Sequence, residues 1–135
     1  MQFVDTNVLL YAISQSTNEQ AKSERANEIL GRRDIGLSVQ VLQEFYVQAT
    51  RSSRSDALSH EQAARLVESF VRFPVQMTTP SLVLAAAATH HRFGISYWDA
   101  AILEAARALG CDVVLSEDLA AGQDYGGVRV DNPFH

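Results

Sequence analysis

Four acidic residues stand out because each occupies a position at which a carboxylate could do chemistry. Asp5 ends one apolar run, Glu44 has apolar neighbours, Asp99 stands near the start of a predicted helix, and Asp118 follows another apolar run. Carboxylates that converge in a cleft repel one another unless a positive group lies among them. Mg²⁺ and Mn²⁺ prefer oxygen ligands, so acids without His or Cys favour these ions over Zn²⁺. Brought together, the four acids would suit a magnesium or manganese centre.

Three of these acids also have a purely structural explanation. Asp99 stands three residues after a serine, where a capping box and the helix dipole account for an acid without catalysis. Asp118 could cap the short turn over residues 116–119, and Asp5 could cap the helix that follows the first strand. For these three residues the sequence leaves both capping and catalysis open.

Glu44 is harder to explain as a structural residue, because a Glu buried among apolar side chains needs a partner. Other polar candidates are weaker. His90 and His91 are adjacent and cannot face one ligand from the same side of a helix. Gly126 and Gly127 lack the strand and helix context of a phosphate-binding loop, so we interpret both pairs as structural.

The elements that must position the acids alternate between strands and helices. Short apolar runs predict strands over residues 1–5, 35–37, 75–77, 112–115 and 128–130. Three- to four-residue spacing of apolar positions, with capping signals, predicts helices over residues 6–12, 18–30, 38–50, 59–73, 80–93 and 96–108. This alternation predicts an α/β fold, a parallel sheet of four to five strands flanked by helices on both faces. Ligands of such sheets bind outside the carboxyl ends of the strands.

The composition indicates one globular domain over residues 1–135. The chain is 47% apolar and 20% charged, which is enough apolar material for a core. Its formal net charge of -5 excludes a global basic field, so any nucleic-acid contact must be local. The single cysteine, Cys111, favours a reducing, cytoplasmic location. The apolar run 8–13 is far shorter than the roughly 20 residues of a membrane span, so we expect no membrane association.

Five segments, considered together, resemble the PIN-domain family, and most closely its VapC-like toxin members. They occur in the family's order and at its spacing, and they span essentially the whole chain. The segments are FVDTNVLLY at 3–11, QEFY at 43–46, SYWDAAI at 96–102, LSEDL at 115–119 and NPF at 132–134. The resemblance implies a PIN-like, Rossmann-like α/β/α sandwich.

The resemblance also implies a metal-dependent endoribonuclease, a hydrolase that uses Mg²⁺ or Mn²⁺ and acts as the toxin of a toxin–antitoxin pair. The four acids named above match the family's four acidic positions. Asn7 and Ser116 fall on polar positions that are expected to orient the carboxylates. Glu117 lies beside Asp118 and could also point into the site, but we prefer Asp118. The expected partners are an RNA substrate, a cognate antitoxin and a second copy of the chain in a homodimer.

Two alternatives belong to other functional classes. A strand that ends in Asp also opens phosphatases of the haloacid-dehalogenase type, but these have a second Asp two residues later, where this chain has Asn7. The other alternative is a catalytically silent PIN-like module that binds RNA or a protein. The intact set of four acids argues against such a loss of activity.

Overall fold

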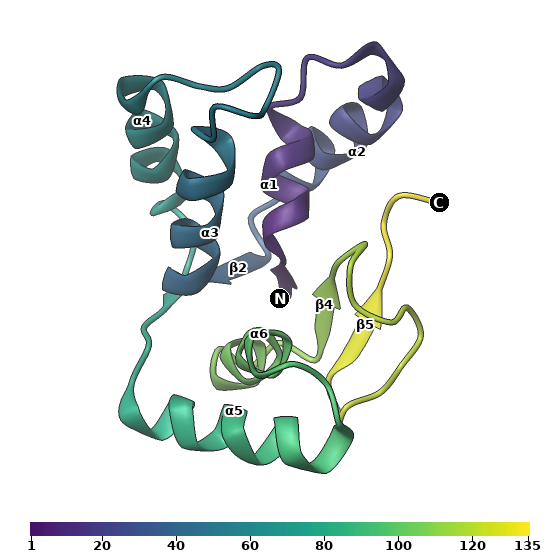
Figure 1. Cartoon of the computed structure of the whole chain (residues 1–135). Helices are drawn as coiled ribbons and strands as arrows, with labels where there is room; N and C mark the ends of the chain where they lie inside the picture. Colours follow the sequence, from purple (N-terminus) through teal and green to yellow (C-terminus); the bar gives the residue numbers. More distant parts are fainter.

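The computed structural model describes residues 1–135, and strands alternate with helices along the chain (Figure 1). The strands are β1 (Gln2–Val4), β2 (Ile35–Ser38), β3 (Val75–Gln76), β4 (Val113–Leu115) and β5 (Arg129–Asp131). The helices are α1 (Thr6–Ala12), α2 (Gln20–Leu30), α3 (Val39–Ala49), α4 (His60–Phe70), α5 (Pro80–Phe93) and α6 (Tyr97–Ala108), with a 3₁₀ turn, η1 (Thr17–Glu19), before α2. All of the predicted elements are present.

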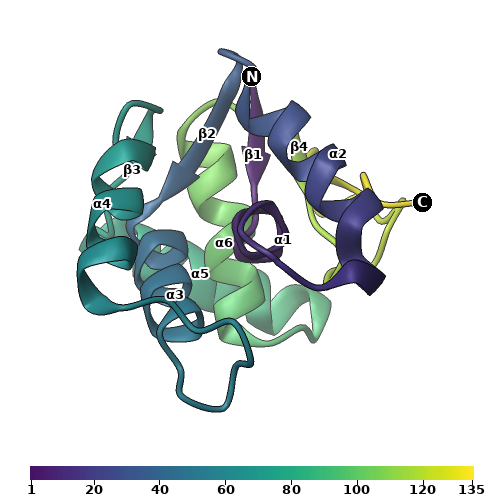
Figure 2. The ribbon, with the colours of Figure 1, turned by 90° about the horizontal axis from the view of Figure 1, so that it is seen from above.

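The five strands form one parallel sheet in the order β3-β2-β1-β4-β5. The chain runs outward from β1 to β3 and then crosses to β4 on the other side of β1. Because right-handed crossovers in opposite directions place helices on opposite faces, α1–α4 lie above the strands in Figure 1 and α5 and α6 lie below. Figure 2 shows α2 and α3 on either side of α1, which both contact. The predicted α/β/α sandwich is confirmed.

The sheet brings the ends of β1 and β4 together at one edge. Val4 is paired in register with Leu115, and the backbone N–H of Asp5 donates to the carbonyl of Leu115 at 3.0 Å. The loops that follow the two strands therefore start side by side. The strand order reverses here, and ligands of open α/β sheets bind at such switch points.

The helix signals in the sequence are confirmed at several termini. Ser38 caps α3, and Ser59 and Gln62 form a reciprocal capping box at the start of α4. Gly94 closes α5 in the left-handed conformation at a φ of 69°. The core is one cluster of 30 buried residues around the sheet and the inner helix faces. No helix is long and apolar enough to cross a membrane.

Several predicted boundaries were wrong by one to three residues, and three of them have a clear cause. The helix expected over 59–73 ends at Phe70, because Pro74 disfavours the helical conformation at the residue before it. The helix expected from residue 18 begins as η1 and becomes α-helical at Gln20. The last strand covers Arg129–Asp131 instead of 128–130, because the carbonyl of Val128 accepts from Tyr125 at 2.8 Å in the preceding turn.

Candidate active site

Asp5 is the most buried of the four acids, with 7% of its surface exposed. It caps α1, since its Oδ1 accepts from the backbone N–H of Thr6 at 2.8 Å, so the capping interpretation is correct for this oxygen. The other oxygen, Oδ2, accepts from the hydroxyl of Ser116 at 2.7 Å. Burial, with smaller contributions from the charges of Glu44 and Asp118, raises the pKa of Asp5 to about 6 against the opposing effect of its hydrogen bonds. Capping of α1 therefore uses only one oxygen of Asp5, and the other oxygen is directed to the loop after β4.

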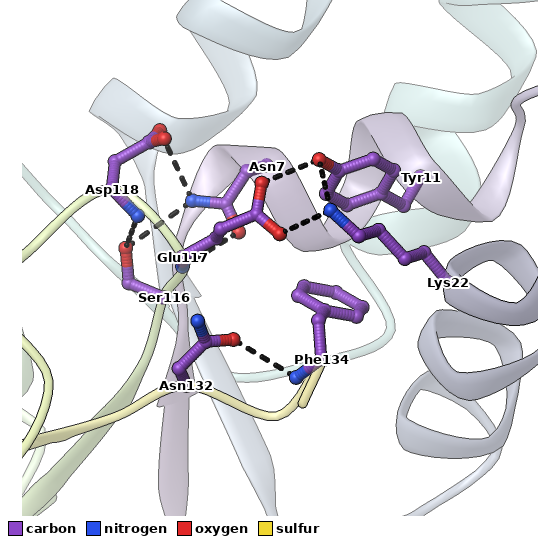
Figure 3. A network of polar contacts seen from close by, with 8 residues as sticks. All are labelled: Asn7, Tyr11, Lys22, Ser116, Glu117, Asp118, Asn132 and Phe134. Carbon is purple, nitrogen blue, oxygen red and sulfur yellow. Dashed lines mark hydrogen bonds and ion pairs between the residues drawn. The ribbon is translucent and has the colours of Figure 1, made fainter. Parts of the chain in front are cut away.

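Ser116 forms the turn that presents Asp118. Its Oγ accepts from the backbone N–H groups of Asp118 at 3.1 Å and Leu119 at 3.3 Å. The serine is thus the cap of this turn, and the interpretation of Asp118 as the cap was wrong. The carboxylate of Asp118 is left free to accept from the side-chain amide of Asn7 at 3.2 Å (Figure 3).

Asn7 connects the loops after β1 and β4. Its Nδ2 lies within hydrogen-bond distance of Asp5 Oδ2 at 3.5 Å, Ser116 Oγ at 3.2 Å and Asp118 Oδ2. Its Oδ1 accepts from the backbone N–H of Glu117 at 3.2 Å. One buried amide therefore fixes two acids relative to each other.

Glu117 points away from the other acids. Its carboxylate accepts from the hydroxyl of Tyr11 and pairs with Lys22 Nζ at 2.7 Å, as Figure 3 shows. These hydrogen bonds, that from Lys22 above all, hold the pKa of Glu117 below its usual range. The C-terminal segment supports this arrangement, because the ring of Phe134 packs edge-on against that of Tyr11 at 4.8 Å between centroids. Glu117 already has a cation, whereas Asp118 has none.

Glu44 projects from α3 toward the start of α1. Its Oε2 accepts from the hydroxyl of Thr6 and its Oε1 from the side chain of Gln40, both at 2.9 Å. The prediction of a buried Glu was wrong in degree: the residue is half-buried, and its neighbour Val47 is 54% exposed. The predicted need for partners is nevertheless met, by Thr6 and Gln40.

Asp99 lies in the first turn of α6, and its backbone N–H donates to the hydroxyl of Ser96 at 3.0 Å. The backbone N–H of Ser96 does not donate back to the carboxylate, so the capping box suggested by the spacing is only half formed. Burial raises the pKa of Asp99, and the charges of Asp118 and Glu44 raise it further, against a hydrogen bond from Ser96. The carboxylate is therefore close to the other acids without being bonded to them.

The four acids thus come from four separate elements and share one edge of the sheet without a basic partner. None of the six ion pairs in the structure involves any of them. As the side chains stand, no group of three or more His, Cys, Asp or Glu residues is placed to hold a metal ion. An open set of carboxylates still fits Mg²⁺ or Mn²⁺, because Mg²⁺ retains several waters and is usually held by one or two carboxylates. The donors present therefore suit a partly hydrated hard cation.

Several residues of this network were not predicted from the sequence. Gln40 could have been found, because it stands four residues before Glu44 on the same helix face. Thr6 could have been noticed only as a neighbour of Asp5. Lys22 and Glu117 are 95 positions apart in the sequence, so no local pattern predicts that they pair.

The family model described as PIN domain matches residues 3–121. Comparison with curated protein sequences finds no match.

Solved structures with the same fold include several toxin–antitoxin proteins. A toxin–antitoxin complex from Klebsiella pneumoniae matches with a TM-score of 0.70 and 18% identity, covering 99% of this chain and 98% of that one. VapC20 of Mycobacterium tuberculosis, described as a toxin that cleaves the sarcin–ricin loop, matches with a TM-score of 0.67 and 21% identity. The match covers 87% of this chain and 92% of that one. DNA-bound VapBC from Salmonella typhimurium matches with a TM-score of 0.66 and 22% identity, covering 98% of this chain and 97% of that one.

At these identities the structural matches show a shared fold. The family model, by contrast, spans most of the sequence, from β1 through the turn that presents Asp118. The chain belongs to the PIN domain family.

Proposed function

We propose that this protein is an Mg²⁺- or Mn²⁺-dependent endoribonuclease and the toxin of a toxin–antitoxin pair. The observation that carries the proposal is the convergence of Asp5, Glu44, Asp99 and Asp118, without a basic partner, at the switch point of the sheet. Four acids held close together at neutral pH need a cation. The same cation would assist hydrolysis of a phosphodiester, because it would stabilise the charge that builds up on the phosphate and on the leaving oxygen.

Each residue has a defined task in this proposal. The four carboxylates would hold the ion, which when bound stabilises the developing charge on the phosphate and lowers the pKa of the attacking water. Asn7 and Ser116 orient Asp5 and Asp118 through the hydrogen bonds described above. Glu117 stays with Lys22 and leaves this role to Asp118.

The pKa of Asp5 adds a pH dependence. Below about pH 6 this carboxyl group holds its proton in the metal-free protein, and a protonated acid is a poor ligand for the ion. Binding of the metal therefore competes with the proton at Asp5. We expect cleavage to rise between about pH 5 and about pH 7.

The alternative of a haloacid-dehalogenase-type phosphatase is disfavoured by Asn7. Its amide protons point at Asp5, Ser116 and Asp118, so the group serves as a fixed donor. An amide cannot exchange a proton as a second Asp would. A catalytically silent module would keep the fold but would not need the four acids. An RNA cleavage assay distinguishes such a module from the nuclease.

The toxin part of the proposal is supported by the similar structures, which include toxin–antitoxin complexes. The partner would be an antitoxin that lays an apolar segment on the helices and brings a basic residue to the acids. Helix α3 offers an apolar docking surface for this segment, because it forms a groove with α4 lined by Leu42, Val47 and Val67. A homodimeric assembly remains a prediction.

RNA cleavage by the purified protein tests the proposal. We expect cleavage with Mg²⁺ or Mn²⁺, none with a chelator, and none by Asp99→Asn. Asn can still lie in the first turn of α6 but does not supply the carboxylate charge. Sequencing of the new RNA ends identifies the target. Cleavage in the presence of chelator, or at the normal rate by Asp99→Asn, would refute the assignment.

Growth on expression tests the toxin part separately. We expect the wild-type chain to arrest growth and the Asp5→Ala variant not to, with soluble expression of both confirmed. Normal growth with wild-type protein would remove the toxin function while leaving the nuclease intact.

A further inference from the structure

A small pocket adjoins the acids on the side of the loop between α3 and α4. Its volume is about 200 Å³, and it shares Asn7 and Asp118 with the candidate active site. The remaining wall consists of Leu10, Tyr11, Glu19, Arg54 and Glu117. Arg54 is the one basic residue among the residues that line it. The pocket therefore places a guanidinium beside an otherwise acidic surface.

Arg54 is held in place by a short chain of contacts. Its Nε lies 2.9 Å from Asp56 Oδ1, and 22% of each side chain is exposed. Asp56 Oδ2 in turn accepts from the backbone N–H of Gln15 at 2.9 Å, which ties the loop to the segment after α1. This hydrogen bond, together with Arg54, holds the pKa of Asp56 below its usual range. Asp56 is thus an ionised anchor for Arg54.

Although Nε of Arg54 is paired with Asp56, its terminal nitrogens are almost unused. Its Nε is buried and has no hydrogen bond of good geometry, despite the ion pair. Its Nη2 makes one long bond, at 3.5 Å, to the carbonyl of Leu10. Arg107, by contrast, donates from all three nitrogens to Glu104 and to the carbonyls of residues 125 and 126. Asp56 thus holds the Nε side of Arg54, and the two terminal nitrogens remain as donors for a ligand.

Within a lining that also holds the acids Glu19, Glu117 and Asp118, the terminal nitrogens of Arg54 are the group that suits a phosphate. Arg binds phosphate through two parallel N–H bonds, which a lysine cannot reproduce. Lys22, the other cation near this edge, donates its hydrogen bonds to Glu117 at 2.7 Å and Tyr11 at 3.3 Å, whereas the terminal nitrogens of Arg54 make only the long bond to Leu10. Because the chain as a whole carries a net charge of -5, a polyanion needs local cations of this kind.

We propose that Arg54 binds a backbone phosphate of the RNA next to the one that is cut, and that Asp56 positions it. This inference rests on the proposed ribonuclease function. It assigns the loop over residues 51–57 to holding the substrate strand, with Arg54 as the contact and Asp56 as a positioning residue.

RNA binding without cleavage provides the test. In an Asp99→Asn background, the Kd for a single-stranded RNA is measured as salt rises from about 50 to about 200 mM. We expect Arg54→Gln to weaken binding about tenfold and to reduce the slope of log K against log salt by about 0.7, the value for one phosphate contact on a single strand. Arg54→Lys should keep the slope and lose affinity, since it keeps the charge without the fork.

Two further variants separate contact from folding. Arg33→Gln removes an exposed arginine before β2, at the opposite edge of the sheet, and should change neither quantity. Asp56→Asn should weaken binding but keep the slope, because Arg54 retains its charge. Melting temperatures show whether each variant is folded. If Arg54 only stabilised the loop, both Arg54→Gln and Asp56→Asn would lower the melting temperature and leave the salt slope intact, which would overturn the inference.

The outcomes distinguish this inference from the proposed function. Normal affinity and slope for Arg54→Gln, in a protein that binds RNA and whose wild-type form cleaves it, would refute the role of Arg54 alone. A chain that neither binds nor cleaves RNA would refute both.

Discussion

Replacing Asp5 by Asn should stabilise the metal-free protein at neutral pH and destabilise it in acid. Burial raises the pKa of Asp5 from 3.8 to about 6, so the folded protein holds this proton more tightly than the unfolded chain. The contribution of this proton to the free energy of unfolding is fully present below about pH 4 and is lost as pH rises through about 6. The wild-type protein should therefore become less stable, through this group, between those values.

The size of the effect follows from the two pKa values. Their separation of about 2 pH units corresponds to about 3 kcal/mol of unfolding free energy, at about 1.4 kcal/mol per unit. Asn removes this pH dependence, but its amide cannot accept at both positions used by Thr6 and Ser116, a loss of about 1 kcal/mol. We expect Asp5→Asn to be less stable than wild type by about 1 kcal/mol near pH 4 and more stable by about 2 kcal/mol near pH 8.

Urea unfolding at these two pH values, with a chelator present, measures the difference directly. Asp112→Asn is a suitable control, because Asp112 is exposed at the opposite end of β4. Its stability difference from wild type should not change sign between the two pH values. A stability difference between wild type and Asp5→Asn that does not change with pH would show that the buried carboxyl group carries no unfavourable charge, and the argument for a cation at this position would fail.

Three further outcomes follow from the same contacts. Millimolar Mg²⁺ should raise the melting temperature of the wild-type protein at about pH 8 by several degrees and much less at about pH 5, and thermal melts of wild type and Asp5→Asn check this. Ser116→Ala removes a hydroxyl that bonds Asp5, Asp118 and Leu119, so it should cost about 2 kcal/mol by urea unfolding and lower the rate of RNA cleavage. Arg107→Ala leaves the buried Glu104 without its ion pair, so it should cost about 2 kcal/mol while folded protein cleaves at the normal rate.

Much of the fold could be predicted from local signals. Capping by Ser38 and by the Ser59–Gln62 box, and the glycine at 94, located helix termini because caps depend on adjacent residues. The alternation of strands and helices predicted a parallel sheet, and the structure confirms it. The end of α4 was missed by three residues, because residues 71–73 form a turn before Pro74 in which the buried Phe73 donates to the carbonyl of Phe70.

The candidate site could be predicted only in part. The positions of the acids relative to strand ends indicated which of them could meet, because parallel strands bring their carboxyl ends to one edge. The roles of Ser116 as the cap of its turn and of Asn7 as a bridge depend on the register of β1 with β4. The place of Arg54 depends on how the loop between α3 and α4 folds back, and no periodic pattern encodes that path.

The central claim is that the four converging carboxylates bind a divalent ion. Titration with Mn²⁺ monitored by electron paramagnetic resonance tests it most directly, because the signal of free Mn²⁺ is lost when the ion binds. The account predicts saturable binding near pH 8 by wild type and by Asp112→Asn, and its loss in Asp5→Asn and Asp99→Asn. Equal Mn²⁺ binding by all four proteins, or none by the folded wild-type protein, would contradict it.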